Sequence, residues 1–323
     1  MTPLSLSLPS FAKINWSLQI LGRRPDGYHE VKTVLQTISL HDDLDFEVTN
    51  SGDISLSCTD PEIPADEQNL IIRAALALKA RHGNSQGARI QLHKRIPAQA
   101  GLGGGSSNAA VSLLALNHLW DLKITPAELI EIAAGLGADV PFFLLGGRAV
   151  ATGTGATVSS ILDNTVDDVY YLIVITPRAR VSTAKAYAAL SVSALTTPAN
   201  DPILSSSREE AKIGRSPLWA LANSMTNDFE PVIFDIEPEI SRTRETLLQA
   251  GALKALLAGS GASVFGIFPD RAAQQRAIKE VKLEAGWRVF PCVTVSRHEY
   301  LRAVGSWDIS FLRSFNSGSD IGA

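Results

Sequence analysis

The stretch IPAQAGLGGGSSNAA, residues 96–110, constrains the fold more strongly than any other part of the chain. Gly101, Gly103, Gly104 and Gly105 lie within five residues of one another. Glycine loses more conformational freedom on folding than other residues, so such a cluster is typical of a backbone that needs positive φ or close approach to a ligand. The following SSNAAVSLLALNHLW has the apolar spacing of a helix, which Ser106 or Ser107 is expected to cap.

A glycine-rich loop that leads into a helix brings together unpaired N–H groups and the positive end of the helix dipole. The sequence therefore predicts a phosphate-binding loop. It is not a Walker loop, which needs Lys and then Ser or Thr where this chain has Ser106 and Ser107. Nor is it the dinucleotide fingerprint, which needs a third glycine at position 106. A flexible linker or a tight turn is the alternative, but Ile96-Pro97 and the helix frame the loop too closely for a linker.

Composition limits the function classes. The 323 residues are enough for two domains, and a net charge of −4 gives no overall basic surface for nucleic acid. Cys58 and Cys292 have no metal-ligand spacing, which favours two reduced thiols. The N-terminus lacks the pattern of a secretory signal, and no apolar run is long enough to span a bilayer. We therefore expect a cytoplasmic monomer or weak homodimer that binds neither nucleic acid nor membrane.

The secondary-structure pattern indicates an α+β protein of two domains, residues 1–163 and 164–323, with a polar boundary near 160–168. AKINWSLQIL alternates as a strand does, and RRPDGYHE, HDD and NSGD carry turn chemistry. Helices are predicted to begin after the capping residues Asn69 and Thr125. Residues 197–217 are expected to be a loop, and the tail 314–323 to fray. Further strands are predicted at 34–40, 44–48, 54–58, 169–177, 253–257, 263–268 and 288–295, and further helices at 182–190, 238–250 and 271–285.

Three other segments carry polar or small residues in places that favour a functional role. Lys13 and Asn15 share one face of a strand, although a single lysine on a strand is more often solvated at an edge. Asp139 stands among apolar residues in GLGADVPFFLLGG, so it must be paired, capping a turn or functional. LLAGSGASVFGIF, residues 256–268, contains a second loop of small residues that alone would be an ordinary turn.

The order of these segments resembles the GHMP kinase superfamily over most of residues 10–295. General members share the glycine-serine loop, whereas RPDGYHE is similar to members that phosphorylate a methylerythritol linked to cytidine diphosphate. The matching blocks are AKINWSLQILGRRPDGYHEV (12–31), DEQNLIIRAA (66–75), PAQAGLGGGSSNAA (97–110), GADVPFF (137–143), TNDFE (226–230) and AGSGASVF (258–265).

The resemblance implies two α+β domains, the first like domain 2 of ribosomal protein S5, with the active site between them. It implies transfer of the γ-phosphoryl group of ATP to the tertiary 2-hydroxyl of that small-molecule substrate, in non-mevalonate isoprenoid precursor synthesis. Mg²⁺ is expected to arrive with ATP, because the loop helix offers no clear acidic ligand and no metal-binding residue is assigned. The implied ATP-binding residues are Pro97, Ala98, Gln99, Ala100, Gly101, Leu102, Gly103, Gly104, Gly105, Ser106, Ser107 and Asn69.

The resemblance also assigns the reacting groups and the cytidine site. The family's catalytic pair corresponds to Lys13 and Asp139, and Asn15 is placed to hold a substrate hydroxyl. Tyr28 and His29 correspond to residues that recognise cytosine. The resemblance further implies that Tyr187 supplies an aromatic ring for the opposite face of the base.

Two departures and two alternatives accompany this hypothesis. Gln99 replaces a small residue of many relatives, and Leu35 replaces an aromatic residue of some. Another kinase of the superfamily, acting on homoserine, mevalonate or a sugar, would have no use for the Tyr28–His29 pair. A nucleotide-binding regulator without catalysis would have no need of Lys13 and Asp139 together.

Overall fold

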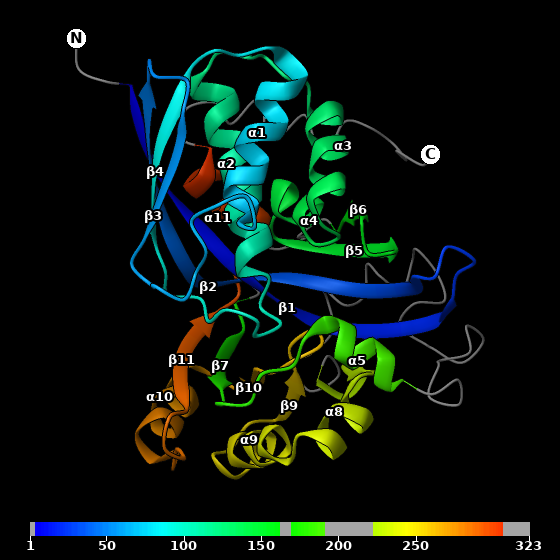
Figure 1. Ribbon diagram of the computed structural model, residues 1–323. Coiled ribbons are helices and arrows are strands. Elements are labelled where there is room, and N and C mark those ends of the chain that lie inside the picture. The colour runs from blue at the N-terminus through cyan, green and yellow to red at the C-terminus, as the bar shows by residue number, and fades with distance from the viewer. Residues whose placement is uncertain (1–3, 162–168, 191–221, 306–323) are drawn as a thin grey trace.

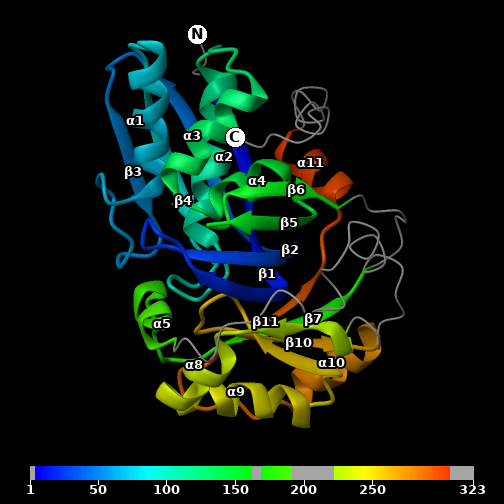
Figure 2. The same cartoon turned by 90° about the vertical axis from the view of Figure 1, so that its right-hand side faces the viewer.

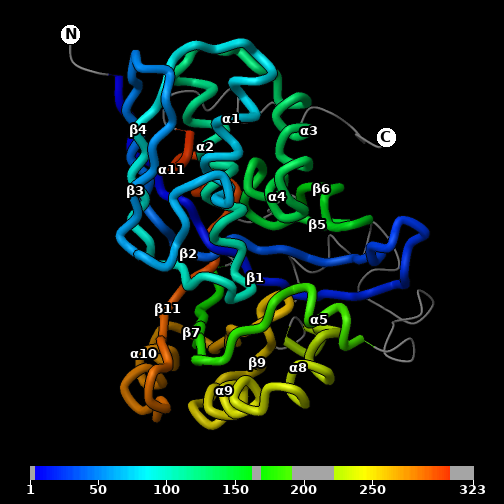
Figure 3. Tube along the Cα trace, viewed as in Figure 1, coloured from blue at the N-terminus to red at the C-terminus, as the bar shows by residue number. Residues whose placement is uncertain are grey.

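The computed structural model describes residues 4–161, 169–190 and 222–305, and these form four layers (Figure 1). Helices cover one face of a large sheet, and the other face lies against a smaller sheet that carries its own helices outside. Figure 2 shows the smaller sheet beneath the long strands of the large one, and Figure 3 follows the chain between them. The α+β class is confirmed. None of the described helices is long and apolar enough to cross a lipid bilayer.

The large sheet is organised by two long antiparallel strands, β1 (Ser5–Arg23) and β2 (His29–Thr49). Its order is β3-β4-β2-β1-β8, and β2 also pairs with β5, which in turn pairs with β6. The other bounds are β3 (Ile54–Cys58), β4 (Gly87–His93), β5 (Arg148–Gly153), β6 (Thr157–Ser160) and β8 (Thr226–Asn227). Its covering helices are α1 (Leu70–His82), α2 (Gly104–Leu119), α3 (Pro126–Leu136) and α4 (Val140–Leu145).

The smaller sheet is antiparallel, in the order β11-β7-β10-β9. Successive side chains of a strand point to opposite faces. In β7, Leu172 and Val174 pack against the large sheet, whereas Ile173 and Ile175 pack among residues of the outer helices. The bounds are β7 (Tyr171–Thr176), β9 (Lys254–Leu257), β10 (Val264–Phe268), β11 (Arg288–Val293), α5 (Thr183–Ala189), α8 (Glu230–Ile236), α9 (Pro238–Gln249) and α10 (Arg271–Glu280).

The turn predicted at HDD is wrong, because β2 runs through residues 41–43 without a break. The ladder instead contains an irregularity: Phe11 pairs with His41, and the next residue of β1 pairs with Ile38. Asp42 therefore lies opposite Ser10 within the sheet and is fully buried. Aspartate is depleted in strands, which is why the local pattern indicated a turn. Its buried hydrogen bonds, described below, explain the exception.

Two segments of the C-terminal half cross to the large sheet. β8 pairs in parallel with β1 at Ser17 and Leu18. The helix α11 (Arg297–Val304) contributes Tyr300 and Leu301 to the core between the large sheet and its helices. The predicted boundary at 163/164, the loop 197–217 and the tail 314–323 all lie outside the described residues. The division into two domains stays a prediction.

Candidate active site

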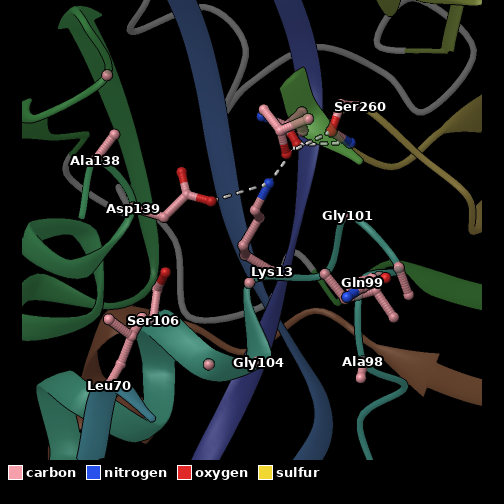
Figure 4. A pocket seen from close by; sticks show the side chains of 18 of the residues that line it. Lys13, Leu70, Ala98, Gln99, Gly101, Gly104, Ser106, Ala138, Asp139 and Ser260 are labelled. Atoms are coloured by element: carbon pink, nitrogen blue, oxygen red, sulfur yellow. Dashed lines mark hydrogen bonds and ion pairs between the residues drawn. The ribbon is translucent and has the colours of Figure 1, made fainter. Parts of the chain in front are cut away.

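A cavity of about 980 Å³ lies where the long strands, the glycine-rich loop and the C-terminal half meet (Figure 4). This volume is at the upper end of the range for ligand sites, about 300–1,000 Å³. Every residue assigned to the site from the sequence lines this cavity, with the exception of Ser107. Residues far apart in the sequence, including Lys13, Asp139, Tyr187 and Ser260, thus face one space.

Lys13 is held on β1 in a buried position, with 4% of its surface exposed. Its backbone N–H donates to Leu102 O of the glycine-rich loop at 2.9 Å, which ties the strand to the loop. Its Nζ donates to Asn15 Oδ1 at 3.0 Å and lies 3.5 Å from Asp139 Oδ2 (Figure 4). Lys13 is therefore not a solvated lysine at a sheet edge, which was the alternative, but a buried residue whose Nζ faces the cavity.

The side chain of Asn15 makes its hydrogen bonds to other groups of the protein. Its Oδ1 accepts from Lys13 Nζ and from Gly259 N at 3.1 Å, and its Nδ2 donates to Thr33 Oγ1 at 2.8 Å. The side chain consequently joins β1, β2 and the second small-residue loop around the lysine. Contact between Asn15 and a substrate hydroxyl stays a prediction.

Asp139 occupies the N-cap position of α4 but makes no capping hydrogen bond with its side chain. Asp139 therefore does not serve merely to cap the turn into VPFF, which was the structural alternative to a functional role. Phe142 and Phe143, which follow in the helix, are fully buried and anchor this segment in the core. The carboxyl group, 37% exposed, reaches out of that apolar base toward Lys13.

The glycine-rich loop has the geometry of an anion site, although its cap differs from the prediction. α2 begins at Gly104, and the N-cap is Gly103 at φ +70°, with no side-chain cap from Ser106 or Ser107. No serine side chain therefore accepts a hydrogen bond from the backbone N–H groups of the first helical turn. Gly101, at φ +75°, passes so close to the carbonyl of Ala258 that a Cβ would overlap it. The two small-residue loops are packed together.

Ser107 and Asn69 have structural partners. Ser107 is fully buried, and its Oγ accepts from Ser10 Oγ at 2.7 Å, so it supports the loop from behind. Asn69 caps α1 as predicted, with Oδ1 accepting from Ile71 N at 2.9 Å and Nδ2 donating to Pro64 O at 2.7 Å. It also lines the cavity, so contact with adenine stays a prediction.

Three aromatic side chains, those of Tyr28, His29 and Tyr187, also line the cavity. The ring of His29 stacks on Tyr187, with centroids 4.6 Å apart and planes 20° from parallel. Burial, followed by the charge of Arg23, lowers the pKa of His29. Burial, reinforced by the negative Asp139, raises the pKa of Tyr187 to about 12. Tyr28, the third of these lining residues, is 67% exposed.

Other lining residues were not assigned to the site from the sequence, among them Thr183, Ser260 and Phe229. Thr183 and Ser260 place their hydroxyl groups 3.2 Å apart, one from α5 and one from the second small-residue loop. Phe229 packs edge-on against Tyr187, with centroids 5.0 Å apart. AGSGA and TNDFE were noted as matching blocks, but no local pattern shows that these two segments converge with α5.

Comparison with known proteins places this fold and site. Residues 69–147 match the family described as GHMP kinases N terminal domain, and residues 216–285 match GHMP kinases C terminal. The fold is shared with the crystal structure of homoserine kinase from Cytophaga hutchinsonii, with a TM-score of 0.65 over 92% of this chain and 96% of that one, at 19% identity. The fold and the loop thus define the GHMP kinase class, for which ATP is the phosphate donor.

The proteins similar in sequence define the family more narrowly than the superfamily models do. The chain is 42% identical to 4-diphosphocytidyl-2-C-methyl-D-erythritol kinase of Pelotomaculum thermopropionicum, over 80% of this chain and 88% of that protein. It is 38% identical to the enzyme of the same name from Alkaliphilus metalliredigens, over 86% and 93%. A crystal structure of 4-(cytidine 5'-diphospho)-2C-methyl-D-erythritol kinase matches with a TM-score of 0.73 and 32% identity, over 90% and 99%. The chain belongs to the 4-diphosphocytidyl-2-C-methyl-D-erythritol kinase family.

Proposed function

We propose that this protein transfers the γ-phosphoryl group of ATP to the tertiary 2-hydroxyl of 4-diphosphocytidyl-2-C-methyl-D-erythritol, in non-mevalonate isoprenoid precursor synthesis. The observation that carries the proposal is the Lys13–Asp139 pair, which faces the same cavity as the glycine-rich loop. Relatives of that name, 38–42% identical over most of the chain, support it.

Asp139 is the group placed to act on the acceptor alcohol. A tertiary hydroxyl is too weak an acid to ionise near pH 7, so a positioned base lowers the barrier. The carboxylate takes the hydroxyl proton as the oxygen attacks the γ-phosphorus, and the bond from that phosphorus to the departing oxygen of ADP breaks. Lys13, 3.5 Å from the carboxylate, is placed to offset charge on the phosphoryl oxygens.

The loop of residues 97–106 is assigned to the ATP phosphates. Gly104, Gly105 and Ser106 form the first turn of α2, where backbone N–H groups and the helix dipole favour an anion. Among the described residues, no group of three or more His, Cys, Asp or Glu side chains could hold a metal ion. Mg²⁺ that arrives with ATP would be held mainly by phosphate oxygens and water, with Ser106 of the loop as the proposed protein ligand, and it would neutralise phosphate charge.

The cytidine end is assigned to Tyr28, His29 and Tyr187. Tyr28 offers an exposed ring for stacking, and His29 lies beside it with a polar ring edge. Two ends of one cavity would thus hold two nucleotide-containing ligands, with the reacting groups between them. The acidic composition and a small-molecule substrate are consistent with a cytoplasmic monomer or weak homodimer that binds neither nucleic acid nor membrane.

A substrate panel tests the proposal. ATP consumption is measured with the cytidyl substrate, its cytidine-free analogue, homoserine and mevalonate. We expect turnover with the cytidyl substrate and little with the other three. Turnover with homoserine or mevalonate instead would favour another kinase of the superfamily. ATP binding without turnover of any of the four would favour a regulator.

A further inference from the structure

We propose that Asp42 is a positioning residue that fixes both ends of the phosphate loop and thereby sets the affinity for ATP. The inference rests on the proposed role of that loop in binding ATP. Asp42 does not line the cavity, so it would act only through the groups that it holds.

The Asp42 carboxylate is fully buried and accepts four hydrogen bonds. Oδ1 accepts from the backbone N–H groups of Arg95, at 2.7 Å, and Ile96, at 2.8 Å. Oδ2 accepts from Lys94 Nζ at 2.8 Å and from Asn108 Nδ2 at 3.0 Å. A buried carboxylate is costly unless it is paired and hydrogen-bonded, and here both oxygens have partners.

These donors come from the two sides of the loop. Residues 94–96 deliver the chain from β4 into the loop, whereas Asn108 lies one turn into α2. Asn108 Nδ2 also donates to Ser10 Oγ at 2.9 Å, and Ser10 Oγ donates to Ser107 Oγ. Ser10 belongs to β1, the strand that carries Lys13. One carboxylate therefore links the start of the loop, the helix after it and the catalytic strand.

Further contacts restrain the start of the loop, residues 94–96. Lys94 Nζ also donates to Ile96 O, and a Cβ on Gly104 would lie 2.9 Å from the Ile96 side chain. The start of the loop and the first residue of α2 are thus in contact. Burial lowers the pKa of Lys94, and the charge of Asp42 opposes that effect. A displacement of residues 94–96 would move the N–H groups that face the cavity.

Asp42→Asn tests the inference because it keeps the shape of the side chain. The amide oxygen can still accept from Arg95 and Ile96, but the NH2 group would face the donors Lys94 Nζ and Asn108 Nδ2. The hydrogen bonds from Asn108 of α2 and from the Lys94 side chain are lost, while the backbone N–H groups of Arg95 and Ile96 keep their acceptor. Asp43→Asn is the matched control, because Asp43 is the next residue of β2 and its partners are the exposed Arg95 guanidinium and His41.

The dissociation constants of a non-hydrolysable ATP analogue and of the cytidyl substrate are measured for each folded variant, together with kcat, both KM values and the melting temperature. We expect Asp42→Asn to raise the dissociation constant and KM of the nucleotide about tenfold or more, and to change those of the cytidyl substrate less than about twofold. Asp43→Asn should match the wild type. Asn108→Ala, which removes only one of the four donors, should shift nucleotide binding in the same direction by a smaller factor.

Unchanged nucleotide affinity in folded Asp42→Asn would overturn the inference, as would an equal loss for both ligands with a lower melting temperature. If Asp42→Asn does not fold, Asn108→Ala decides, and wild-type nucleotide affinity in that variant overturns the inference. A wild-type protein that binds the ATP analogue but does not phosphorylate the cytidyl substrate would refute the proposed function and leave the binding test of Asp42 valid. A wild type without nucleotide binding would refute both.

Discussion

At the scale of single residues, Lys13 has a position that does not depend on Asp139. Asn15 accepts from its Nζ at 3.0 Å, whereas the nearest oxygen of Asp139 is 3.5 Å away. The Asp139 side chain is partly exposed to the cavity, and the residues after it are buried. A substitution at Asp139 is therefore expected to change the chemistry more than the structure.

We predict that Asp139→Asn lowers kcat by about 10²–10⁴, the usual contribution of a positioned acid or base, because an amide cannot take the hydroxyl proton. The ATP dissociation constant and melting temperature should stay close to those of the wild type. Asp121→Asn is the control, since Asp121 is exposed after the end of α2. A kcat within about tenfold of the wild type, or about 1.4 kcal/mol in the barrier, would exclude Asp139 as the base.

Tyr28 gives a second prediction at this scale. Its ring is 67% exposed, so it contributes little to the core, and Tyr28→Ala should leave the melting temperature unchanged. If the ring stacks on cytosine, the substitution should weaken binding of the cytidyl substrate by about 1–3 kcal/mol and leave ATP affinity unaltered. Tyr28→Phe, which keeps the ring, should bind nearly as the wild type does. Early melting with equal loss of both ligands would mean that Tyr28 serves the fold.

At the scale of elements, the glycine-rich loop contains glycines that are needed for the backbone conformation and others that could be needed only for the approach of a ligand. Gly103 needs a positive φ, and a Cβ there would lie 3.0 Å from Lys13 Cγ, so its replacement would strain the fold. Gly105 needs neither: it is exposed in α2, and the nearest protein atom to an added Cβ is 3.9 Å away. Any loss of ATP binding on adding a methyl group at Gly105 must therefore come from the approach of the ligand.

We predict that Gly105→Ala weakens ATP binding about tenfold or more. The fold should keep its stability or gain up to about 1 kcal/mol, because alanine favours a helix over glycine. Gly135→Ala in α3 is the control: it also adds a methyl group in open space on a helix, away from the cavity. Calorimetric titration with ATP and thermal melting distinguish the two variants. Wild-type ATP affinity in Gly105→Ala would mean that the phosphates do not lie against this turn.

Elements with local signals could be predicted from the sequence, and those set by distant partners could not. The Asn69 and Thr125 caps occur where predicted, because each depends on the next few residues of the chain. β3 also occurs where its flanking turns predicted it, although its partner strand β4 is distant in the sequence. Asp42 was misassigned to a turn because its four donors lie more than 50 residues away. The approach of Lys13 and Asp139 was implied by resemblance alone, since strand alternation cannot bring residues 126 positions apart together.

At the scale of the whole molecule, the two sheets share one core. Ile14 and Trp16 of β1 pack in the same cluster as Leu172 of β7 and Phe265 of β10. α11, from the end of the described chain, completes the separate core around α2 and α4. Its Tyr300 is fully buried and donates through its hydroxyl group to Phe143 O of α4. The early and late parts of the sequence are therefore expected to unfold together.

We predict that Tyr300→Ala lowers the free energy of unfolding by about 3–5 kcal/mol, the cost of a large buried aromatic side chain, and shifts one cooperative transition as a whole. Tyr300→Phe is the matched control. It keeps the ring against Gly146 and removes only the hydrogen bond, so it should cost about 0.5–1.5 kcal/mol.

Scanning calorimetry checks the prediction, because equal calorimetric and van't Hoff enthalpies identify a single transition. Trp120 lies in the core around α2, and Trp287 lies in the core between the smaller sheet and its outer helices, so variants that keep only one of the five tryptophans report the melting of each core separately. If Tyr300→Ala moves the melting of the Trp120 region and leaves that of the Trp287 region in place, the two halves unfold independently. In that case the shared core between the sheets does not couple them, and the catalytic pair on the N-terminal half could form without Tyr187 and the other groups that the C-terminal half contributes to the cavity. A common shift would instead mean that a change in α11 disturbs both ends of the cavity at once.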